Sequence, residues 1–410
     1  MRRDPRTSCN THDVRLILRV LGLSVLAALT ACAPNYATRP HTPGFTGPIV
    51  ITQGGVYRGQ WESFNPREPA VVIRTTERVV IQDATIRAVG DLINATAGDA
   101  DVVVRNVTGV GIHPEEAGRY PGRFFAGYRV RALVVERSHT ERTSGILVNT
   151  WTGRADAGQT ITVRYNTARN IEGRYSDGKG GWQTAFYPVA FVQLDRVQGI
   201  RDASIEWNRV ENQPGESRVE DNINLYNSSG LPGSPIRVNN NLIIGAYGWP
   251  LGSSFSGGGI VLGDACGASG YSEAVGNTVI ETSNYGIAVA GGNDQRIVGN
   301  VILARGVMSD GRRLDAEPDA GIYLRDYCRT AKQDPRTVVA SDNIVSWGPP
   351  RPELNNRRAD LHNGAGTAMN NTFIGEGKDT VDEETIRDAI AQWERRAREA
   401  RITVGTVASR

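Results

Sequence analysis

The sequence predicts an all-β fold: a single-stranded right-handed parallel β-helix of about ten or eleven coils, followed by a C-terminal amphipathic helix. Three observations lead to this prediction. Short apolar alternations that reach an asparagine recur along the chain, a second set of segments aligns on its isoleucines, and no helical periodicity interrupts residues 48–375. The 47 glycines among 410 residues suit a fold with many turns. A regular solenoid leaves no room for a domain boundary inside this region.

The N-terminal segment has the composition of an export signal. Five arginines within residues 1–19 precede an apolar run, Val20 to Ala31, of about 12 residues. Such a run is too short to span a bilayer as a mature helix and has the length of a signal-peptide core. Residues 1–31 are therefore expected to be a signal peptide. Residues 32–47, rich in proline, threonine and glycine, are expected to be a flexible tether.

The end of the apolar run carries a further motif. Leu29-Thr30-Ala31-Cys32 resembles the bacterial lipobox, in which small residues precede a cysteine that becomes lipidated. The resemblance implies an exported lipoprotein that is anchored in the cell envelope through Cys32. Residue 33 is alanine and not aspartate, so the inner-membrane retention signal is missing and the outer membrane is the expected location. The alternative is an ordinary secretory peptide in which Cys32 is incidental.

One asparagine recurs at the same place in seven segments. Each segment alternates apolar and polar residues, reaches the asparagine and continues with a second apolar pair; the asparagines are Asn166, Asn208, Asn241, Asn277, Asn300, Asn343 and Asn371. Their spacing varies from 23 to 43 residues. A fixed local pattern at variable spacing predicts one strand–turn–strand unit with loops of variable size. Inward asparagine side chains would then stack and bind the turn backbones of neighbouring coils.

A second set of strands supports the same architecture. Five segments align with isoleucine in one column and valine or leucine two residues later; the isoleucines are Ile146, Ile223, Ile260, Ile287 and Ile322. This alternation is typical of a strand with one buried face. Parallel strands need crossover connections, and here only short strands and loops are available to provide them, so the chain must coil.

These motifs carry a resemblance to a known group of proteins. The repeated GN-x-I and GI-x-L patterns resemble the pectate-lyase-like superfamily of right-handed parallel β-helix proteins, and residues 51–63 (ITQGGVYRGQWES) look like a first coil. The resemblance covers roughly residues 48–375 and implies a β-helix domain over residues 48–377. The superfamily includes polysaccharide lyases, hydrolases, epimerases, phage tailspikes and adhesins, so it does not choose the chemistry.

The C-terminus has a different pattern. Thr380 to Glu383 fits a capping box, and Ile386, Ile390, Trp393 and Ala397 lie on one helical face. Residues 380–400 are therefore expected to form an amphipathic helix that covers the open end or the flank of the solenoid. We expect residues 378–410 to contain this helix and a short strand packed on the solenoid. A helix that binds a partner is the alternative.

The charge balance limits the partners. Lys+Arg 46 against Asp+Glu 44 gives a formal net charge of +2, which argues against a nucleic-acid binder that depends on a strong positive field. The expected partner is a polysaccharide, acidic ones included, and the expected state is a monomer. Any acidic substrate must therefore be held by local arginines.

Candidate catalytic residues follow from the aligned strands. Asp264 and Asp326 share an outward column two coils apart, which places them roughly 9–10 Å from each other because coils stack at about 4.8 Å. This lies at the edge of the range of about 6.5–9.5 Å that inverting glycosidases use. Arg325 stands beside Asp326, and Glu220 and Asp221 begin the strand one coil before Asp264. The alternative is that each aspartate bonds its own turn backbone.

Other side chains near this groove are suited to binding sugars. Tyr226, Trp151 and Trp249 are candidates for stacking on sugar rings, and Arg312 and Arg313 for holding the carboxylates of an acidic polymer. Packing within the fold is the alternative for the aromatic residues.

A lyase of the pectate type would need a base and a cation. Arg325 beside Asp264 and Asp326 would supply such an arrangement, with Ca²⁺ between the two acids. Otherwise we expect no cofactor. No zinc-spaced Cys/His cluster, phosphate loop or nucleophile elbow appears, and His113 and His139 are expected to be structural or solvated.

Two cysteines remain after Cys9 is cleaved off and Cys32 is lipidated. Cys266 and Cys328 fall in the same column two coils apart, which is slightly beyond the Cα separation of about 7 Å that a disulfide tolerates. Bending of the loops would close this gap, and an exported compartment favours oxidation. The sequence leaves the pairing open.

Two functional hypotheses remain. The first is a polysaccharide-active enzyme, a lyase or a glycoside hydrolase, with its groove around Asp264, Arg325 and Asp326. The second is a non-catalytic cell-surface β-helix that binds a glycan or a protein partner. Converging carboxylates in an open cleft favour the first, whereas aspartates turned into local backbone bonds favour the second.

Overall fold

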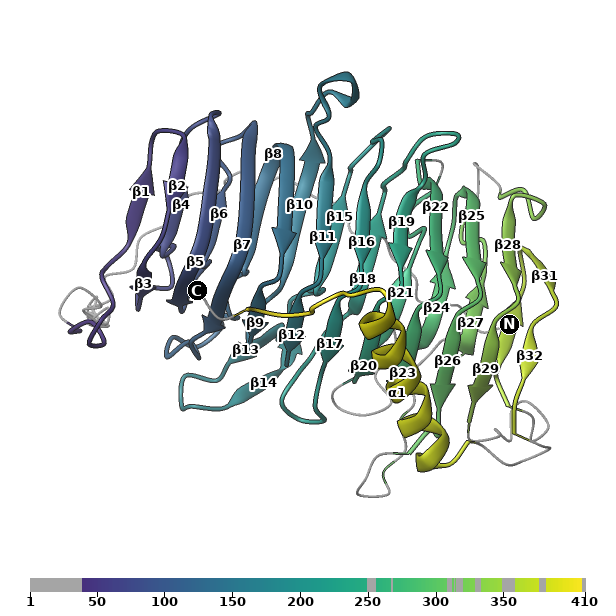
Figure 1. Cartoon of the computed structure of the whole chain (residues 1–410). Coiled ribbons are helices and arrows are strands. Elements are labelled where there is room, and N and C mark those ends of the chain that lie inside the picture. Colours follow the sequence, from purple (N-terminus) through teal and green to yellow (C-terminus); the bar gives the residue numbers. More distant parts are fainter. Residues whose placement is uncertain are drawn as a thin grey trace, which may run out of the picture. The chain divides into compact units, whose positions relative to one another are not determined.

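The chain coils through three parallel sheets, and each coil adds one strand to each sheet (Figure 1). This is a computed structural model, and it describes residues 39–248, 256–266, 268–307, 312, 314, 320–328, 333–348, 358–375 and 381–407. The fold is a parallel β-helix, which confirms the fold class that the sequence predicts.

The first sheet contains eleven strands among the described residues, which agrees with the expected ten or eleven coils. In parallel order they are β1 (Ile49–Ile51), β4 (Val71–Ile73), β6 (Ile93–Ala95), β8 (Phe125–Glu136), β10 (Ile146–Trp151), β15 (Val192–Asp195), β18 (Asp221–Tyr226), β21 (Gly258–Val261), β24 (Tyr285–Val289), β27 (Ala320–Leu324) and β30 (Leu361–Asn363).

The other two sheets repeat this order. The second sheet contains β2 (Gly55–Tyr57), β5 (Arg78–Ala88), β7 (Ala100–Gly111), the later part of β8, β11 (Ile161–Arg164), β16 (Ser204–Glu206), β19 (Ile236–Asn239), β22 (Gly270–Val275), β25 (Asn293–Val298), β28 (Val338–Ser341) and β31 (Thr367–Met369). The third contains β3 (Gln60–Ser63), the ends of β5 and β7, β9 (His139–Glu141), β12 (Thr167–Arg169), β17 (Arg209–Glu211), β20 (Leu242–Ala246), β23 (Thr278–Thr282), β26 (Val301–Ala304), β29 (Ile344–Trp347) and β32 (Thr372–Phe373).

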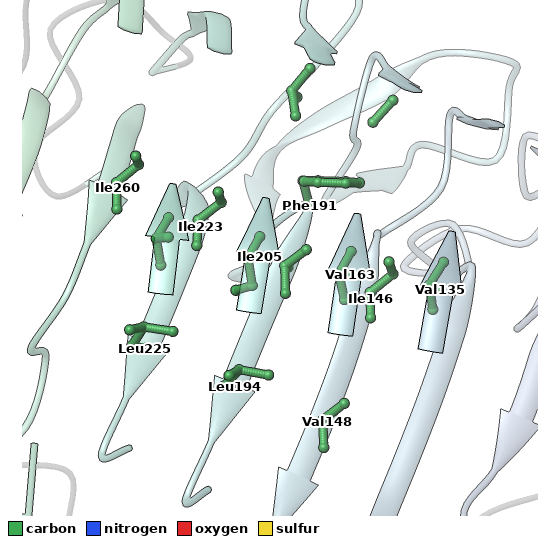
Figure 2. Close-up of a cluster of buried hydrophobic side chains, with 14 of the residues drawn as sticks. Val135, Ile146, Val148, Val163, Phe191, Leu194, Ile205, Ile223, Leu225 and Ile260 are labelled. Carbon is green, nitrogen blue, oxygen red and sulfur yellow. The ribbon is translucent and has the colours of Figure 1, made fainter. Parts of the chain in front are cut away.

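The predicted isoleucine column forms the core of the first sheet. Its five members are at most 1% exposed, and they pair in register along the sheet. Figure 2 shows part of this core, where Ile146, Ile223 and Ile260 lie in one row. The predicted alignment omitted one coil, because β15 has Val192 in the column between Ile146 and Ile223.

The seven asparagines form the predicted ladder. The amide nitrogens of the first six each donate to the side-chain oxygen of the next asparagine at 2.8 to 3.0 Å, and that of Asn371 donates to the Ala340 carbonyl. Each ladder residue follows a position with positive φ, where glycine or asparagine is favoured; these positions are Tyr165, Trp207, Asn240, Gly276, Gly299, Asp342 and Asn370. The GN pairs in the sequence therefore mark the corner that leads into the third sheet.

The C-terminal helix covers the flank of the solenoid and not its end. Helix α1 (Glu383–Glu399) buries Ile386 against Ile280 and Leu303 of the third sheet, and Trp393 against Leu242 (Figure 1). The predicted apolar face is therefore confirmed.

The start of α1 differs from the prediction. Its N-cap is Asp382, whose carboxylate accepts the Thr385 amide at 2.8 Å, and Glu383 is the first helical residue. Asp382 is a better N-cap than the predicted capping box because it lies directly before the helix and adds a negative charge at its N-terminus. Thr380 lies outside the described residues.

The segment after α1 forms no strand among the described residues, contrary to the expected short strand. It runs back along the solenoid, where the Gly405 amide donates to the Tyr165 carbonyl and the Val407 amide to Asn106 Oδ1. Single hydrogen bonds to corner residues hold this segment in place of regular strand pairing, because the strands of the third sheet already pair with one another.

Two short elements lie outside the three sheets. The 3₁₀ turn η2 comprises Ala155–Ala157, and β13 (Arg174–Ser176) with β14 (Trp182–Phe186) forms an antiparallel hairpin between β12 and β15. Along the described part of the chain, no helix combines the length and the apolar character needed to cross a membrane.

Candidate active site

A cavity of about 240 Å³ lies on the outer side of the first sheet, over β18, β21, β24 and β27. Three carboxylic acids from two neighbouring coils line it, together with three tyrosines: Glu220, Asp221, Asp264, Tyr285, Tyr323 and Tyr327. The cavity therefore combines acidic groups with aromatic surface, which is a common composition of ligand sites.

Asn224 holds two of the acids together. Its Nδ2 donates to Asp221 Oδ2 at 2.9 Å and to Asp264 Oδ2 at 3.1 Å. Asn224 points outward because it lies between Ile223 and Leu225, which are both buried in the core. The side-chain oxygen of Asn224 is buried and lacks a hydrogen-bond partner among the described residues.

A tyrosine two coils away completes the arrangement. The hydroxyl of Tyr285 in β24 donates to Asp221 Oδ1, so this contact crosses the intervening coil of β21. Gly258 of β21 pairs with Asp221, and a Cβ at Gly258 would lie 2.2 Å from Asp221 Oδ1 and 2.6 Å from the Tyr285 ring. Only glycine therefore fits at position 258, because a side chain there would clash with Asp221 and Tyr285.

Burial and mutual repulsion change the acidity of these groups. Burial, Asp221 and Asp264 raise the pKa of Glu220 to about 8, while burial and Asp264 raise the pKa of Asp221 to about 7. Burial also raises the pKa of Asp264, and the hydrogen bond from Asn224 opposes this rise. Glu220 and Asp221 therefore retain protons near neutral pH, as in other coupled carboxyl sites.

A cationic and aromatic cluster forms the rim of the cavity. Arg325 Nη1 donates to the Tyr323 hydroxyl at 3.2 Å, and its guanidinium lies 4.8 Å from the Tyr327 ring centre. The Tyr323 and Tyr327 hydroxyls are 2.5 Å apart. His362 stands 4.9 Å from the Tyr323 ring, where burial and Arg325 lower the pKa of its imidazole.

A disulfide joins two sides of the cavity. Cys266 and Cys328 are bonded with their Cα atoms 5.3 Å apart, which answers the question that the sequence left open. Cys266 lines the cavity next to the Asp264 loop, and Cys328 follows Tyr327. The glycine at position 291 of the intervening coil lets the bridge pass, because a Cβ there would lie 2.8 Å from Cys328 Sγ.

Asp326 does not join the acidic cluster. Its carboxylate accepts the backbone amides of Cys328 at 2.8 Å and of Gln333 at 3.1 Å, so it stabilises a turn. The structure therefore does not show the predicted pairing of Asp264 with Asp326. The Ca²⁺ expected between Asp264 and Asp326 stays a prediction. In the described ranges, no group of three or more His, Cys, Asp or Glu residues could hold a metal ion.

The remaining predicted residues have different positions. Tyr226 ends β18 and is 42% exposed on the same outer side as Asn224. Trp151 packs against the core and donates its indole N–H to the Arg131 carbonyl, as the packing alternative expects. Arg312 is exposed. Trp249, Arg313 and Cys32 lie outside the described residues.

Several residues of this site were not predicted from the sequence: Asn224, Asn284, Tyr285, Tyr323 and Tyr327. A signal for two of them was present. Asn224 and Tyr323 stand between the two inward residues of their aligned strands, where period-two alternation directs a side chain outward. Tyr285 had no such signal, since its contact with Asp221 spans two coils.

Both histidines make contacts that fit the structural role expected from the sequence. His139 Nδ1 is 2.8 Å from Thr167 Oγ1, as a structural side chain would be. His113 lines a second cavity beside Trp182.

The arrangement is suited to acid–base chemistry. Glu220, which keeps its proton, lines the same cavity as Asp264, whose pKa is raised by burial and lowered by the hydrogen bond from Asn224, and aromatic rings line this cavity too. The chain matches no protein-family model and no curated protein sequence.

Proposed function

We propose that this protein is a glycoside hydrolase of the pectate-lyase-like superfamily that cleaves a polysaccharide in the acidic cavity. One observation carries the proposal: three carboxyls of two adjacent coils meet in a cavity where burial and repulsion raise the pKa values of Glu220 and Asp221. The eleven coils and the asparagine ladder support the superfamily assignment.

Each acid has a role in this proposal. Glu220, protonated at neutral pH, gives its proton to the glycosidic oxygen while the bond from that oxygen to the anomeric carbon breaks. Asp264 acts in its ionised form, which the hydrogen bond from Asn224 favours against the effect of burial, and either takes a proton from the attacking water or itself attacks the anomeric carbon. Asp221 and Tyr285 position Asn224 and keep the local charge low.

The residues that line the acidic cavity favour hydrolysis over the lyase reaction. Elimination needs a base beside the uronate carboxylate and a cation to neutralise that carboxylate. Among the described residues that line the cavity none is basic, and Arg325 is engaged with Tyr323 at the rim. An acidic lining can donate and accept protons but offers no cation to neutralise a uronate carboxylate.

A substrate screen tests the proposal. The purified protein is incubated with neutral and uronate polysaccharides, and reducing ends are measured together with the ultraviolet absorbance of unsaturated products. We expect reducing ends without that absorbance. Equal amounts of both signals would identify a lyase, and neither signal from a folded protein would favour the non-catalytic alternative.

The pH dependence of the reaction follows from the raised pKa of Glu220. The acid must be protonated, so the rate is expected to fall as pH rises through about 8. The Asp221 charge contributes to this pKa, and Asp221→Asn should therefore move the alkaline limb to lower pH. The measurement is kcat/KM against pH for both proteins. An alkaline limb that Asp221→Asn leaves in place would contradict the assignment.

We also propose that the protein is exported and lipidated at Cys32. The Cys266–Cys328 disulfide supports export, because disulfides persist in oxidising compartments. Mass spectrometry of the mature protein from a lipoprotein-processing bacterium should find Cys32 as an N-terminal, lipid-modified residue. A mature chain that retains residues before Cys32 would refute this.

A further inference from the structure

A second cavity, of about 420 Å³, lies at the corner where the third sheet leads back to the first. Five successive coils each contribute to it at the end of β5, β7, β9, β12 and β17, and the β13–β14 hairpin closes it. Its polar and aromatic lining consists of Arg87, His113, Arg142, Glu172, Trp182 and Glu216. None of these residues belongs to the acidic cavity.

The hairpin is held in place by a buried ion pair. Glu172 accepts the backbone amide of Arg174 at 2.8 Å and its Nε at 2.9 Å, and the two side chains are 2% and 5% exposed. Arg174 Nη2 also donates to the Gly215 carbonyl at 2.8 Å, which ties the hairpin to the next coil. A buried pair of this kind costs desolvation energy, and its fixed geometry sets the position of the hairpin.

Two neighbouring side chains hold Trp182 in place. The Arg174 guanidinium lies 5.4 Å from its ring centre, and the His113 ring stands 4.2 Å away. His113 Nε2 is 3.2 Å from the Gly181 carbonyl, and the tip of the hairpin is closed by Asp177, which accepts the Gly181 amide at 2.9 Å. The indole therefore lines the cavity as a pre-organised surface and remains partly exposed.

The composition of this cavity fits a sugar ring. An indole offers an apolar face to the C–H groups of a sugar, while guanidinium and carboxylate groups bind its hydroxyls. Arg87, Arg142 and Glu216 are the side chains of the lining that solvent reaches and that can make such bonds. The mixture of both charges suits a hydroxyl-rich ligand better than a purely anionic one.

The two cavities follow one another along the same edge of the solenoid. Glu172 pairs with Arg218 of the next coil in a parallel bridge, and Arg218 lies two residues before Glu220 of the acidic cavity. Adjacent coils are about 4.8 Å apart, so one polymer chain can reach both cavities.

We propose that the hairpin cavity binds a sugar unit of the polysaccharide at a distance from the acidic cavity, with Trp182 as its platform. This inference rests on the proposed function for the identity of the ligand. A remote subsite gives long chains an affinity that short oligosaccharides lack.

The test compares Trp182→Ala with the wild type in two measurements. Affinity electrophoresis in gels that contain neutral or uronate polysaccharides reports binding, and reducing-end assays on long chains and short oligosaccharides report cleavage. We expect Trp182→Ala to weaken polymer binding by about tenfold or more and to raise KM for long chains, with kcat on short oligosaccharides unchanged. Trp182→Phe, which keeps a ring, should restore most of the binding.

Phe373→Ala is the matched control, because Phe373 is an aromatic residue that is 47% exposed and lines neither cavity. Unchanged binding by folded Trp182→Ala, or no binding by the wild type to any polysaccharide, overturns the inference. If the protein cleaves the polysaccharide but binds it equally well without Trp182, only the inference about the hairpin cavity is overturned. If binding depends on Trp182 but no cleavage occurs, only the proposed hydrolase activity is overturned. If Trp182→Ala does not fold, Arg142→Ala at the exposed rim is the second variant, with the same expected loss of binding.

Discussion

Asp264→Asn is expected to lower kcat/KM for the polysaccharide by about 10³-fold, because the variant lacks the ionised carboxylate that acts on the anomeric carbon or on water. Asparagine has nearly the same shape and can still accept the hydrogen bond that Asn224 donates to Asp264. The fold and the affinity for substrate should therefore be retained, so the loss should appear in kcat. Reducing-end kinetics, with circular dichroism to confirm folding, provide the measurement.

Asp326→Asn is the matched control for this prediction. The sequence suggested Asp264 and Asp326 equally, but Asp326 binds the backbone amides of Cys328 and Gln333. Asparagine retains one acceptor for this turn, so the activity of Asp326→Asn should stay within about threefold of the wild type. Equal losses of activity in the two variants would support the catalytic groove around Asp264 and Asp326 that the sequence suggested. Near wild-type activity of Asp264→Asn would remove Asp264 from the mechanism.

Asn277→Ala is expected to have the largest effect on stability, about 3–5 kcal/mol of the free energy of unfolding. Asn277 Oδ1 accepts the backbone amide and the side-chain amide of Asn241, and its Nδ2 donates to the Val238 carbonyl and to Asn300. Alanine removes all four of these bonds in a site that water does not reach; Asn241 Nδ2 keeps its bond to the Ile205 carbonyl and Asn300 Oδ1 its bond from the backbone amide of residue 277. Denaturant unfolding followed by circular dichroism measures the loss.

The control for the ladder is Asn371→Ala. Asn371 ends the described ladder and is partly exposed, so water can replace part of what its side chain provides. The expected cost is about 1 kcal/mol. Equal destabilisation by the two substitutions would show that the ladder contributes through local turn geometry and not through its buried continuity.

The inward positions explain why the fold could be predicted. An inward residue in a stack of coils meets the same neighbours in every coil, so the same residue types recur: isoleucine in the first sheet and asparagine at the corner before the third. Even the omitted coil obeys this rule with Val192, which fills the column with a smaller aliphatic side chain. The pattern was therefore visible without any alignment.

The candidate site could be predicted only in part, because its residues lie at outward positions. Outward positions do not repeat, and the role of each depends on contacts between coils. Glu220, Asp221 and Asp264 were found because carboxylates at strand ends stand out in the sequence. Tyr285 was missed because it reaches Asp221 across the space that Gly258 leaves open. The Trp182 platform was missed because the hairpin that carries it lies outside the repeat.

By itself, the sequence determined the parallel β-helix, its number of coils, the asparagine ladder and the apolar face of the C-terminal helix, since each depends on a periodic burial pattern. The tertiary structure alone decided which aspartate faces the cavity, that Cys266 meets Cys328, and that α1 lies on the flank. The physical reason is that periodicity sets which side of a strand is buried, whereas loop paths and contacts between coils set where an outward side chain points.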